Sequence, residues 1–360
     1  MSDTVFGRAQ SELTLLAQAL GLGAQVPAWQ QSLGAYLHRM RDRPLDLPPL
    51  WSGLSDDCTP WELSIVLRPA AVDLRILLEA QAEPATPSSY WEAALALTES
   101  LDDADRSRFH SLAPLFRPTD PGAFWALWNA IDFGRGARPM HKIYFNAAAS
   151  GPAEAPRLVR TAMEQLGFGA AADALFSRLD PSDQLTHISL DLGAQAAGRL
   201  KIYARHRAAS FARLEELFAY SPSHRAGDVE LLGRVGLGAP DFSRRPVFGV
   251  FHFVDPRNAL PHRTTLNVPT IPYAANDAEV TERLRALIAH LGLDEAPYRA
   301  ACSHLFRGRD PAQERGRHSY LSLQRDGEAP RLTIYFGAML FRDRYGLHGI
   351  DPTRTWPSPI

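Results

Sequence analysis

Hydrophobic and polar residues alternate with a period of two in many short segments of the chain, and this alternation is typical of β-strands. The predicted strands form five pairs, at 62–67 and 73–79, 124–133 and 140–147, 186–193 and 199–206, 246–254 and 264–271, and 317–324 and 331–341. Segments with helical spacing lie between the pairs, at 88–110, 153–177, 208–222, 278–293 and 296–305. We therefore expect an α+β fold in which strand pairs alternate with helices, and Asp277 as the N-cap of the helix that begins at Ala278.

The beginning of the chain has a different pattern, because its apolar residues follow helical spacing. The apolar stripe of the first predicted helix consists of Leu13, Leu15, Leu16, Ala19 and Leu20. Gly21 and Gly23 are stop signals for this helix, a second helix is predicted at 26–42, and a proline-rich connector follows at 43–51. We expect this helical segment, residues 1–50, to precede the strand pairs.

The strand pairs form a weak internal repeat. One central residue marks the second strand of each pair, and successive markers are 59 to 69 residues apart: Arg75, Tyr144, Tyr203, Asn267 and Tyr335. Five repeats of two strands predict ten antiparallel strands with helices around them. Because no low-complexity segment or long linker interrupts the series, we expect residues 1–360 to form a single domain, with the helical segment at 1–50 and the five repeats at 51–345.

Each predicted strand has one apolar and one polar face, because successive side chains point to opposite sides of a strand. The polar faces repeatedly carry arginine, lysine and tyrosine: Arg75, Lys142, Tyr144, Arg199, Lys201, Tyr203 and Tyr335. A sheet with one face in water explains such a pattern in any single strand. If helices cover the apolar faces, however, a closed barrel places the polar faces in a shared lumen, and ten strands leave that lumen wide enough for substrates.

The residue types on these polar faces suit the ionisation of an allylic diphosphate. In a partly dehydrated lumen, arginines and lysines bind a polyanion such as diphosphate strongly. Tyrosine rings stabilise a nearby cation by roughly 0.5–2 kcal/mol, and they also shield it from water. Glu62, on the polar face of the first predicted strand, has two interpretations of equal weight. It accepts the N–H of an indole while the cation attacks the ring, or it neutralises one of the lumen cations.

Composition and charge exclude several classes of function. Lys and Arg total 38 against 40 Asp and Glu, so the formal net charge of −2 predicts no general attraction to nucleic acid or to a membrane. The two cysteines, Cys58 and Cys302, argue against a disulfide framework or a cysteine-rich metal site. The N-terminus lacks a secretory signal pattern, and no stretch approaches the ~18 apolar residues of a membrane-spanning helix. We therefore expect a cytoplasmic protein.

Motifs of other chemistries receive no support from the sequence. The segment FGRGARP at 133–139 lacks the spacing of a nucleotide-binding P-loop and predicts a hairpin turn. The acidic residues Asp102, Asp103 and Asp105 do not have the spacing of a magnesium-diphosphate motif and indicate a solvated helix end. The chain contains neither an HExxH pair nor a GxSxG motif, so we expect no metal site and no serine hydrolase chemistry.

Five short motifs follow one another in order along the chain. The first combines acidic residues, Thr-Pro and a glutamate, ahead of a strand that carries an arginine: Asp56, Asp57, Thr59, Pro60, Glu62 and Arg75. The others are at 142–144 (KIY), 199–203 (RLKIY), 273–277 (YAAND) and 333–335 (TIY). With these motifs the chain resembles, over nearly its whole length, the dimethylallyltryptophan synthase (DMATS-type) family of aromatic prenyltransferases, especially its bacterial members.

This resemblance implies the αββα barrel, in which ten antiparallel strands enclose a solvent-filled lumen inside an outer ring of helices. It implies transfer of a dimethylallyl group from dimethylallyl diphosphate to an indole, often tryptophan, in secondary metabolism, with no required cofactor and no essential magnesium. It carries the diphosphate-binding roles onto Arg75, Lys142, Arg199 and Lys201. It carries the cation-shielding roles onto Tyr144, Tyr203 and Tyr335, and the role of indole N–H acceptor onto Glu62.

The chain departs from the family pattern at two places. In the fourth repeat the family often has a Lys or Gln and then a Tyr, whereas this chain has Thr265 and Asn267. The prenyl pocket is then larger, and geranyl diphosphate becomes an alternative donor. In the third repeat, fungal members that hold free tryptophan use an arginine that is missing here at 186–191. Either the acceptor has no free carboxylate, or another residue binds that carboxylate. His187 is a candidate for this binding role, and a structural role for this histidine has equal weight.

Some alternatives stay open at this point. Trp61 and Trp125 are core candidates that can also line the acceptor pocket. A barrel of the same fold can prenylate a non-indole aromatic, or it can hold an aromatic ligand or a prenyl diphosphate without catalysis. Glu62 and the four cations argue against a mere binding protein, which needs no such set. A transferase with another phosphorylated donor would show metal dependence.

Overall fold

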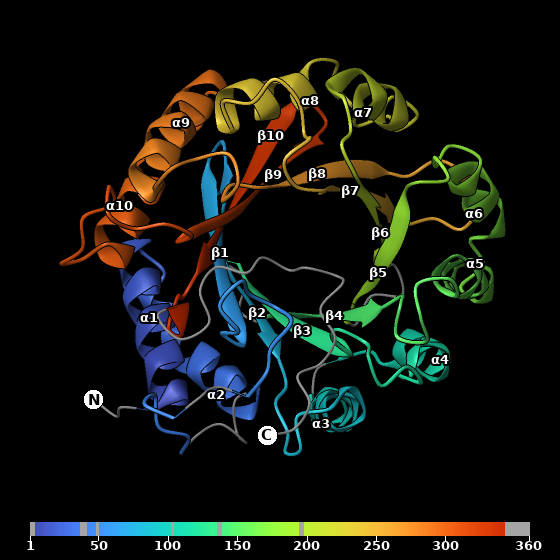
Figure 1. The fold of residues 1–360 in the computed structure, drawn as a ribbon, viewed down its shortest axis with the longest axis horizontal. Helices are drawn as coiled ribbons and strands as arrows, with labels where there is room; N and C mark the ends of the chain where they lie inside the picture. Colours follow the sequence, from blue (N-terminus) through green and yellow to red (C-terminus); the bar gives the residue numbers. More distant parts are fainter. Residues whose placement is uncertain are drawn as a thin grey trace.

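Ten strands close into a barrel in the computed structural model, which describes residues 4–36, 42–47, 50–101, 104–134, 139–193 and 198–342. The strands are β1 (Trp61–Arg68), β2 (Ala71–Glu79), β3 (Leu127–Phe133), β4 (Met140–Asn146), β5 (Gln184–Asp191), β6 (Leu200–His206), β7 (Val247–Phe253), β8 (Arg263–Pro269), β9 (His318–Asp326) and β10 (Ala329–Gly337). Each is antiparallel to its neighbour along the chain, and β10 pairs with β1 to complete the circle (Figure 1). The five predicted strand pairs are confirmed.

Helices form a ring around the outside of the barrel (Figure 1). They are α1 (Val5–Ala19), α2 (Val26–Tyr36), α3 (Pro87–Glu99), α4 (Ser107–Phe116), α5 (Ala155–Gln165), α6 (Gly169–Phe176), α7 (Phe211–Phe218), α8 (Asp228–Leu231), α9 (Asp277–His290) and α10 (Ala296–Leu305). α1 and α2 precede β1, and the later helices connect one strand pair to the next, as the sequence repeat predicts.

The hydrophobic core lies between the barrel and this ring of helices. One face of each strand supplies it, and several of its isoleucines have no exposed surface: Ile65, Ile76, Ile143, Ile202 and Ile334. Burial of such a side chain stabilises the fold by roughly 1.5–3 kcal/mol. Because the apolar faces are covered by helices, the polar faces of the strands point into the lumen. This confirms the barrel interpretation over a sheet with one face in water.

Two of the predicted helices are each divided in the structure. The segment at 88–110 contains α3, which ends at Glu99, and α4, which begins at Ser107. The segment at 153–177 contains α5 and α6, which are separated at Gly167. The φ of Gly167 is 84°, a left-handed conformation that interrupts a helix and suits glycine. Apolar spacing continues on both sides of such a turn, so the pattern alone does not reveal it.

The predicted N-cap of α9 is wrong by one residue. Asn276 caps the helix, because its side-chain oxygen accepts a hydrogen bond from the backbone N of Glu279 at 3.0 Å. The carboxylate of Asp277 instead accepts from the backbone N–H groups of Arg317 and His318, at 3.1 and 2.8 Å. Asp277 therefore joins the start of α9 to the start of β9.

The apolar stripe predicted for α1 also needs correction, because Leu15 and Ala19 are exposed while Leu13 and Leu16 are buried. Several sequence predictions fall partly or wholly outside the described residues: the end of the second helix at 37–42, the acidic residues at 102–103, the turn at 133–139 and the end of the last repeat at 343–345. Among the helices that the structure does describe, none has the length and apolar character needed to cross a membrane.

Candidate active site

Two layers of inward-facing residues lie along the axis of the barrel. On β4, Lys142 precedes Tyr144 on the same face, and Lys201 precedes Tyr203 in the same way on β6. We call the first set the charged layer; it consists of Arg75, Asp132, Lys142, Asp191, Arg199 and Lys201. We call the second set the aromatic layer; it consists of Trp125, Trp128, Tyr144, His187, Tyr203, Phe248, Tyr320 and Tyr335.

Ion pairs hold the charged layer together. Lys142 Nζ and Arg75 Nε lie 2.7 and 2.8 Å from the same oxygen, Oδ2 of Asp132. Arg199 Nε lies 2.7 Å from Oδ2 of Asp191. The four cations predicted from the sequence are thus brought together, and they share two carboxylates. Within the layer as described, this leaves an excess of two positive charges.

Burial lowers the pKa of both lysines in the charged layer. Lys142 is 2% exposed and Lys201 is 8% exposed, so desolvation is the main cause in each case, and neighbouring arginines add to it. Burial raises the pKa of Asp132, but Arg75 and Lys142 outweigh this effect and hold that pKa well below its usual range. A ligand with several negative charges would compensate the excess cations. The layer therefore suits a polyanion such as diphosphate.

The aromatic layer surrounds a cavity of about 550 Å³, within the usual range for small-molecule sites. Tyr144 and Tyr203 meet edge to face with ring centroids 6.0 Å apart, and Tyr320 and Tyr335 do so at 6.5 Å. The three tyrosines predicted from the sequence all line the cavity, and Tyr320 joins them. Together their rings can stabilise a cation that forms between them.

A second aromatic group covers another part of the cavity wall. Trp125 stacks on Trp128 at a centroid distance of 3.9 Å, and His187 stacks on Trp125 at 4.7 Å. Burial lowers the pKa of His187 to about 3, and Arg205 adds to this effect. The imidazole is therefore neutral near pH 7, which suits stacking against a flat aromatic acceptor better than binding a carboxylate.

Glu62 lies on the wall of the same cavity and is 7% exposed. Its Oε1 accepts a hydrogen bond from Ser319 Oγ at 2.5 Å. Burial raises the pKa of Glu62 to about 7; Asp56 adds to the rise, while Ser319 and Arg245 oppose it. In the described part of the chain Glu62 forms no ion pair with a lumen cation. Of the two interpretations of Glu62, the geometry favours binding of the acceptor over charge neutralisation.

The loop before β1 fixes the position of Glu62. The Oδ1 of Asp57 accepts from Ser55 Oγ at 2.9 Å and from the backbone N of Thr59 at 3.2 Å. Its Oδ2 accepts from Thr59 Oγ1 at 2.9 Å and from the backbone N of Phe341 at 3.0 Å. The acidic-Thr part of the sequence motif therefore holds the turn and joins it to the segment after β10. It positions the glutamate and does not line the cavity.

Asp56, the other acidic residue of the motif, joins this loop to the aromatic layer. Its two oxygens accept from the two terminal nitrogens of Arg245 at 3.0 and 3.1 Å. The guanidinium of Arg245 lies 5.6 Å from the ring centroid of Tyr320. Asp56 therefore holds a cation over the ring of Tyr320, close enough to Glu62 to interact with it electrostatically. Neither Arg245 nor Tyr320 belongs to the motifs found in the sequence.

A second buried carboxylate, Glu79 at the end of β2, supports the tryptophan wall. Its Oε1 accepts from Trp128 Nε1 at 3.0 Å. Its Oε2 accepts from Ser52 Oγ at 2.6 Å and from the backbone N of Gly53 at 2.9 Å. Burial raises the pKa of Glu79 to about 7, and these hydrogen bonds oppose the rise. Glu79 fixes the orientation of Trp128, a role that its position at the end of a strand does not signal.

Two candidate pocket residues lie outside the cavity. Trp61 is fully buried in the outer core, because it precedes Glu62 on the same strand and must point to the opposite side. Thr265 lies beside the charged layer and does not line the cavity, whereas Asn267, Trp125 and His187 do.

The alternation of residues did not reveal every important side chain. Asp132, which pairs with two of the cations, lies on β3, and every residue of that strand is buried. Without a polar face to contrast with an apolar one, the period of two carries little signal there. Arg205 also lines the cavity, and its position two residues after Tyr203 is a signal that was available in the sequence.

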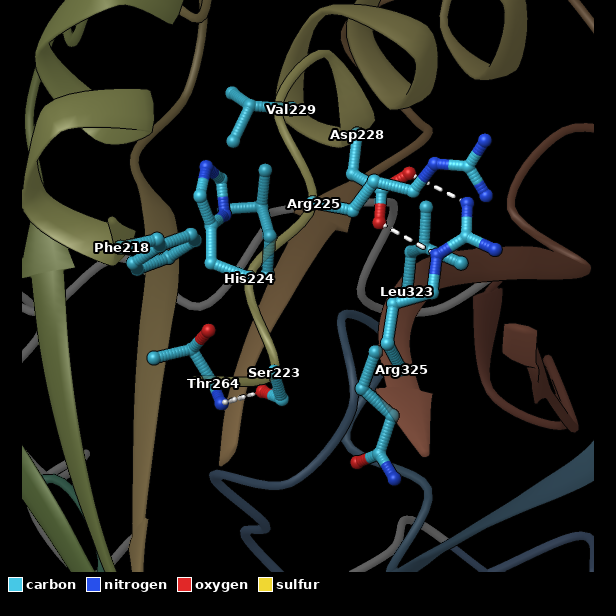
Figure 2. A pocket seen from close by; sticks show the side chains of 11 residues that line it. Phe218, Ser223, His224, Arg225, Asp228, Val229, Thr264, Leu323 and Arg325 are labelled. Carbon is cyan, nitrogen blue, oxygen red and sulfur yellow. Dashed lines mark hydrogen bonds and ion pairs between the residues drawn. The ribbon is translucent and has the colours of Figure 1, made fainter. Parts of the chain in front are cut away.

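A second hollow lies outside the lumen, and Figure 2 shows that His224, Asp228 and Arg325 surround it. Asp228 accepts two hydrogen bonds from Arg325, at 2.8 and 2.6 Å. The volume of this hollow is about 20 Å³, which is room for roughly one or two water molecules. It is too small for an organic substrate, so the lumen cavity is the candidate active site.

Comparison with known proteins agrees with this geometry. A family model described as tryptophan dimethylallyltransferase matches residues 30–300 of the chain. The chain belongs to this family. The family resemblance inferred from the five sequence motifs is thereby confirmed.

Solved structures of related bacterial enzymes match nearly the whole chain. The 6-dimethylallyltryptophan synthase from Micromonospora olivasterospora, in complex with DMASPP and Trp, is 27% identical, with a TM-score of 0.88 over 94% of this chain and 98% of its own. The 5-dimethylallyl tryptophan synthase from Streptomyces coelicolor is 29% identical, with a TM-score of 0.87 over 95% and 97%. The prenyltransferase PriB, in a ternary complex with L-tryptophan and dimethylallyl thiolodiphosphate, is 30% identical, with a TM-score of 0.87 over 94% and 97%. The barrel is therefore the αββα fold of prenyltransferases, as expected.

Proposed function

We propose that the protein transfers a dimethylallyl group from dimethylallyl diphosphate to the indole ring of tryptophan or of another indole-containing metabolite. The C–O bond between the prenyl group and diphosphate breaks, a bond from the prenyl carbon to the ring forms, and the ring proton is lost. The products are a prenylated indole, inorganic diphosphate and a proton. The complexes of the related enzymes with tryptophan and a thiolodiphosphate of the same prenyl group support this donor and this acceptor.

One observation carries the proposal: a buried carboxylate and a wall of aromatic rings face one cavity that adjoins a cluster of cations. Glu62 can accept the indole N–H, which raises the electron density of the ring. Tyr144 and Tyr335 are close enough to Arg75 to interact with it electrostatically, so the aromatic layer adjoins the charged layer. A prenyl cation that forms above the charged layer is therefore surrounded by tyrosines and protected from water.

The charged layer is proposed to bind the leaving group. Arg75, Lys142, Arg199 and Lys201 would stabilise the negative charge that develops on the diphosphate as the C–O bond breaks. We expect these four cations to replace magnesium. Among the described residues, no group of three or more His, Cys, Asp or Glu side chains is placed to hold a metal ion. Independence from metals stays a prediction that requires a direct assay.

The test is an incubation of the purified protein with dimethylallyl diphosphate and a panel of indoles, including tryptophan, in the presence of EDTA. Mass spectrometry would then detect the addition of one prenyl unit. We expect a product with at least one indole. Glu62→Gln serves as the matched variant, because it keeps the shape of the side chain and removes its charge.

Other outcomes would change the proposal in defined ways. A product with geranyl diphosphate but not with dimethylallyl diphosphate would mean that Asn267, which lines the cavity, has altered the donor pocket. A product only with a non-indole acceptor would mean that the acceptor is another aromatic compound and not an indole. A product only with magnesium would contradict the role of the charged layer. The proposal treats residues 1–360 as a single domain, and both this and the cytoplasmic location stay predictions.

A further inference from the structure

A row of polar side chains continues the charged layer onto β7, β8 and β9, where the fourth repeat departs from the family pattern. His252 on β7 pairs in register with Lys201 on β6, so it faces the lumen, and it is 3% exposed. Its Nε2 lies 3.0 Å from Thr265 Oγ1 on β8, which in turn lies 2.9 Å from Gln324 Oε1 on β9. We call His252, Thr265 and Gln324 the β7–β9 row.

Two atoms of this row, His252 Nδ1 and Gln324 Nε2, are buried without a hydrogen-bond partner among the residues that the structure describes. The hydroxyl of Thr265 donates its one proton to Gln324 Oε1, because a carbonyl oxygen only accepts, and it therefore accepts from the Nε2–H of His252. In this tautomer His252 Nδ1 is a lone pair without a partner among the described residues. Buried polar atoms are normally paired. The unpaired atoms therefore point to a ligand that completes the row.

The charged groups around His252 show which ligand would fit. The titratable side chains that act on the imidazole are Lys201, Arg199, Arg263 and His262. Two carboxylates in the same region are already paired, Asp191 with Arg199 and Asp326 with Arg263. The β9 side contributes the neutral Gln324 and Asp326, whose charge is paired with Arg263. Burial, with the neighbouring cations, holds the pKa of His252 well below its usual value, so the ring is neutral without a ligand. An anion is the ligand that this environment lacks.

We propose that His252 binds the diphosphate of the prenyl donor as an imidazolium, and that the protein takes up one proton with the donor and releases it with the product diphosphate. This inference rests on the proposed function. A bound diphosphate brings several negative charges beside Lys201 and so favours the protonated ring. The imidazolium then donates from Nε2 to Thr265 and from Nδ1 to a phosphate oxygen, while Gln324 Nε2 can donate to the same group. His252 thus supplies the hydrogen-bond donor to the diphosphate that Thr265 on β8 does not supply.

Isothermal titration calorimetry with inorganic diphosphate tests the proposal on the full chain. The same titration at about pH 8, in buffers with different ionisation enthalpies, gives the number of protons taken up on binding. His252→Gln keeps an amide donor near the position of Nε2 but has no titratable group. We expect this variant to bind diphosphate about 10- to 100-fold more weakly. We also expect it to take up close to one proton fewer than the native protein.

Two further variants complete the experiment. His290→Gln changes an exposed histidine on α9 and should leave binding and proton uptake unchanged. His252→Asn places an amide near the position of Nδ1, so it should recover part of the affinity without the proton uptake, and it also serves if the glutamine variant does not fold. Native affinity or native proton uptake in the His252 variants would overturn the inference. If the native protein itself does not bind diphosphate, the proposed function is wrong as well.

Discussion

Glu62→Gln tests the proposed mechanism most directly. Glutamine has nearly the same shape as glutamate, and its carbonyl oxygen can accept the hydrogen bond that Ser319 now donates at 2.5 Å. The substitution therefore removes the negative charge beside the expected position of the indole N–H and little else. The charge affects both catalysis and folding. We therefore expect the variant to lose catalytic rate and to gain stability.

The loss of rate follows from the Coulomb interaction between Glu62 and the acceptor. Positive charge develops on the indole as the prenyl cation attacks the ring. A carboxylate about 5 Å away stabilises that charge by roughly 3 kcal/mol at an effective dielectric constant of about 20. We therefore expect kcat to fall roughly 100- to 300-fold. The Kd for diphosphate should change by less than about twofold, because Glu62 is not part of the charged layer.

The stability of the same variant should rise. Burial raises the pKa of Glu62 from 4.5 to about 7 in the folded protein. As the pH rises through this window, the unfolded chain loses the proton first, so ionisation favours unfolding. Above pH 7 the buried charge lowers the free energy of unfolding by about 3 kcal/mol. The glutamine variant carries no charge at this position and keeps that free energy. The variant should therefore be more stable than the native protein at high pH and equally stable below about pH 4.5.

Steady-state kinetics with product detection by mass spectrometry, together with urea unfolding at both pH extremes, measure the two effects. Ser319→Ala is the matched control: it removes the hydrogen bond that lowers the pKa of Glu62, so the activity should need a higher pH while the rate at high pH stays close to native. A Glu62→Gln variant with the native rate would refute the catalytic role. A variant that is less stable at high pH would refute the reasoning about its buried charge.

The remaining predictions concern the two layers. Glu79→Gln replaces one carboxylate oxygen by an amide NH2, which must face either Trp128 Nε1–H or the backbone N–H of Gly53. Because both of these groups are donors, one hydrogen bond is lost, and the KM for the indole should rise about tenfold while the Kd for diphosphate stays native, as kinetics and calorimetry would show. Asn267→Tyr fills part of the cavity and should lower activity with geranyl diphosphate at least about tenfold relative to dimethylallyl diphosphate in a competition assay; equal losses with both donors would contradict this placement. Lys142→Met leaves Asp132 with one cation instead of two and should weaken diphosphate binding about 10- to 100-fold by calorimetry, whereas unchanged binding would remove Lys142 from the proposed diphosphate site.

Much of the site could be predicted from single strands. Lys142 and Tyr144, or Lys201 and Tyr203, share a face wherever the strand lies, because side chains two residues apart always do. The same rule places Trp61 opposite Glu62, and applying it would have removed Trp61 from the candidate pocket. The number of strands, their polar faces and the set of cations and tyrosines are local properties of this kind, and the sequence by itself determined them.

The partners of these side chains were decided only by the tertiary structure. Asp132 shares its carboxylate between Arg75 and Lys142 because β3 lies between β2 and β4 in the closed barrel. His252 meets Thr265 through the register of β7 and β8. Alternation along a strand follows from its covalent geometry, so a short segment contains it. Register and barrel closure depend on many weak contacts between distant segments, and no short segment contains that information.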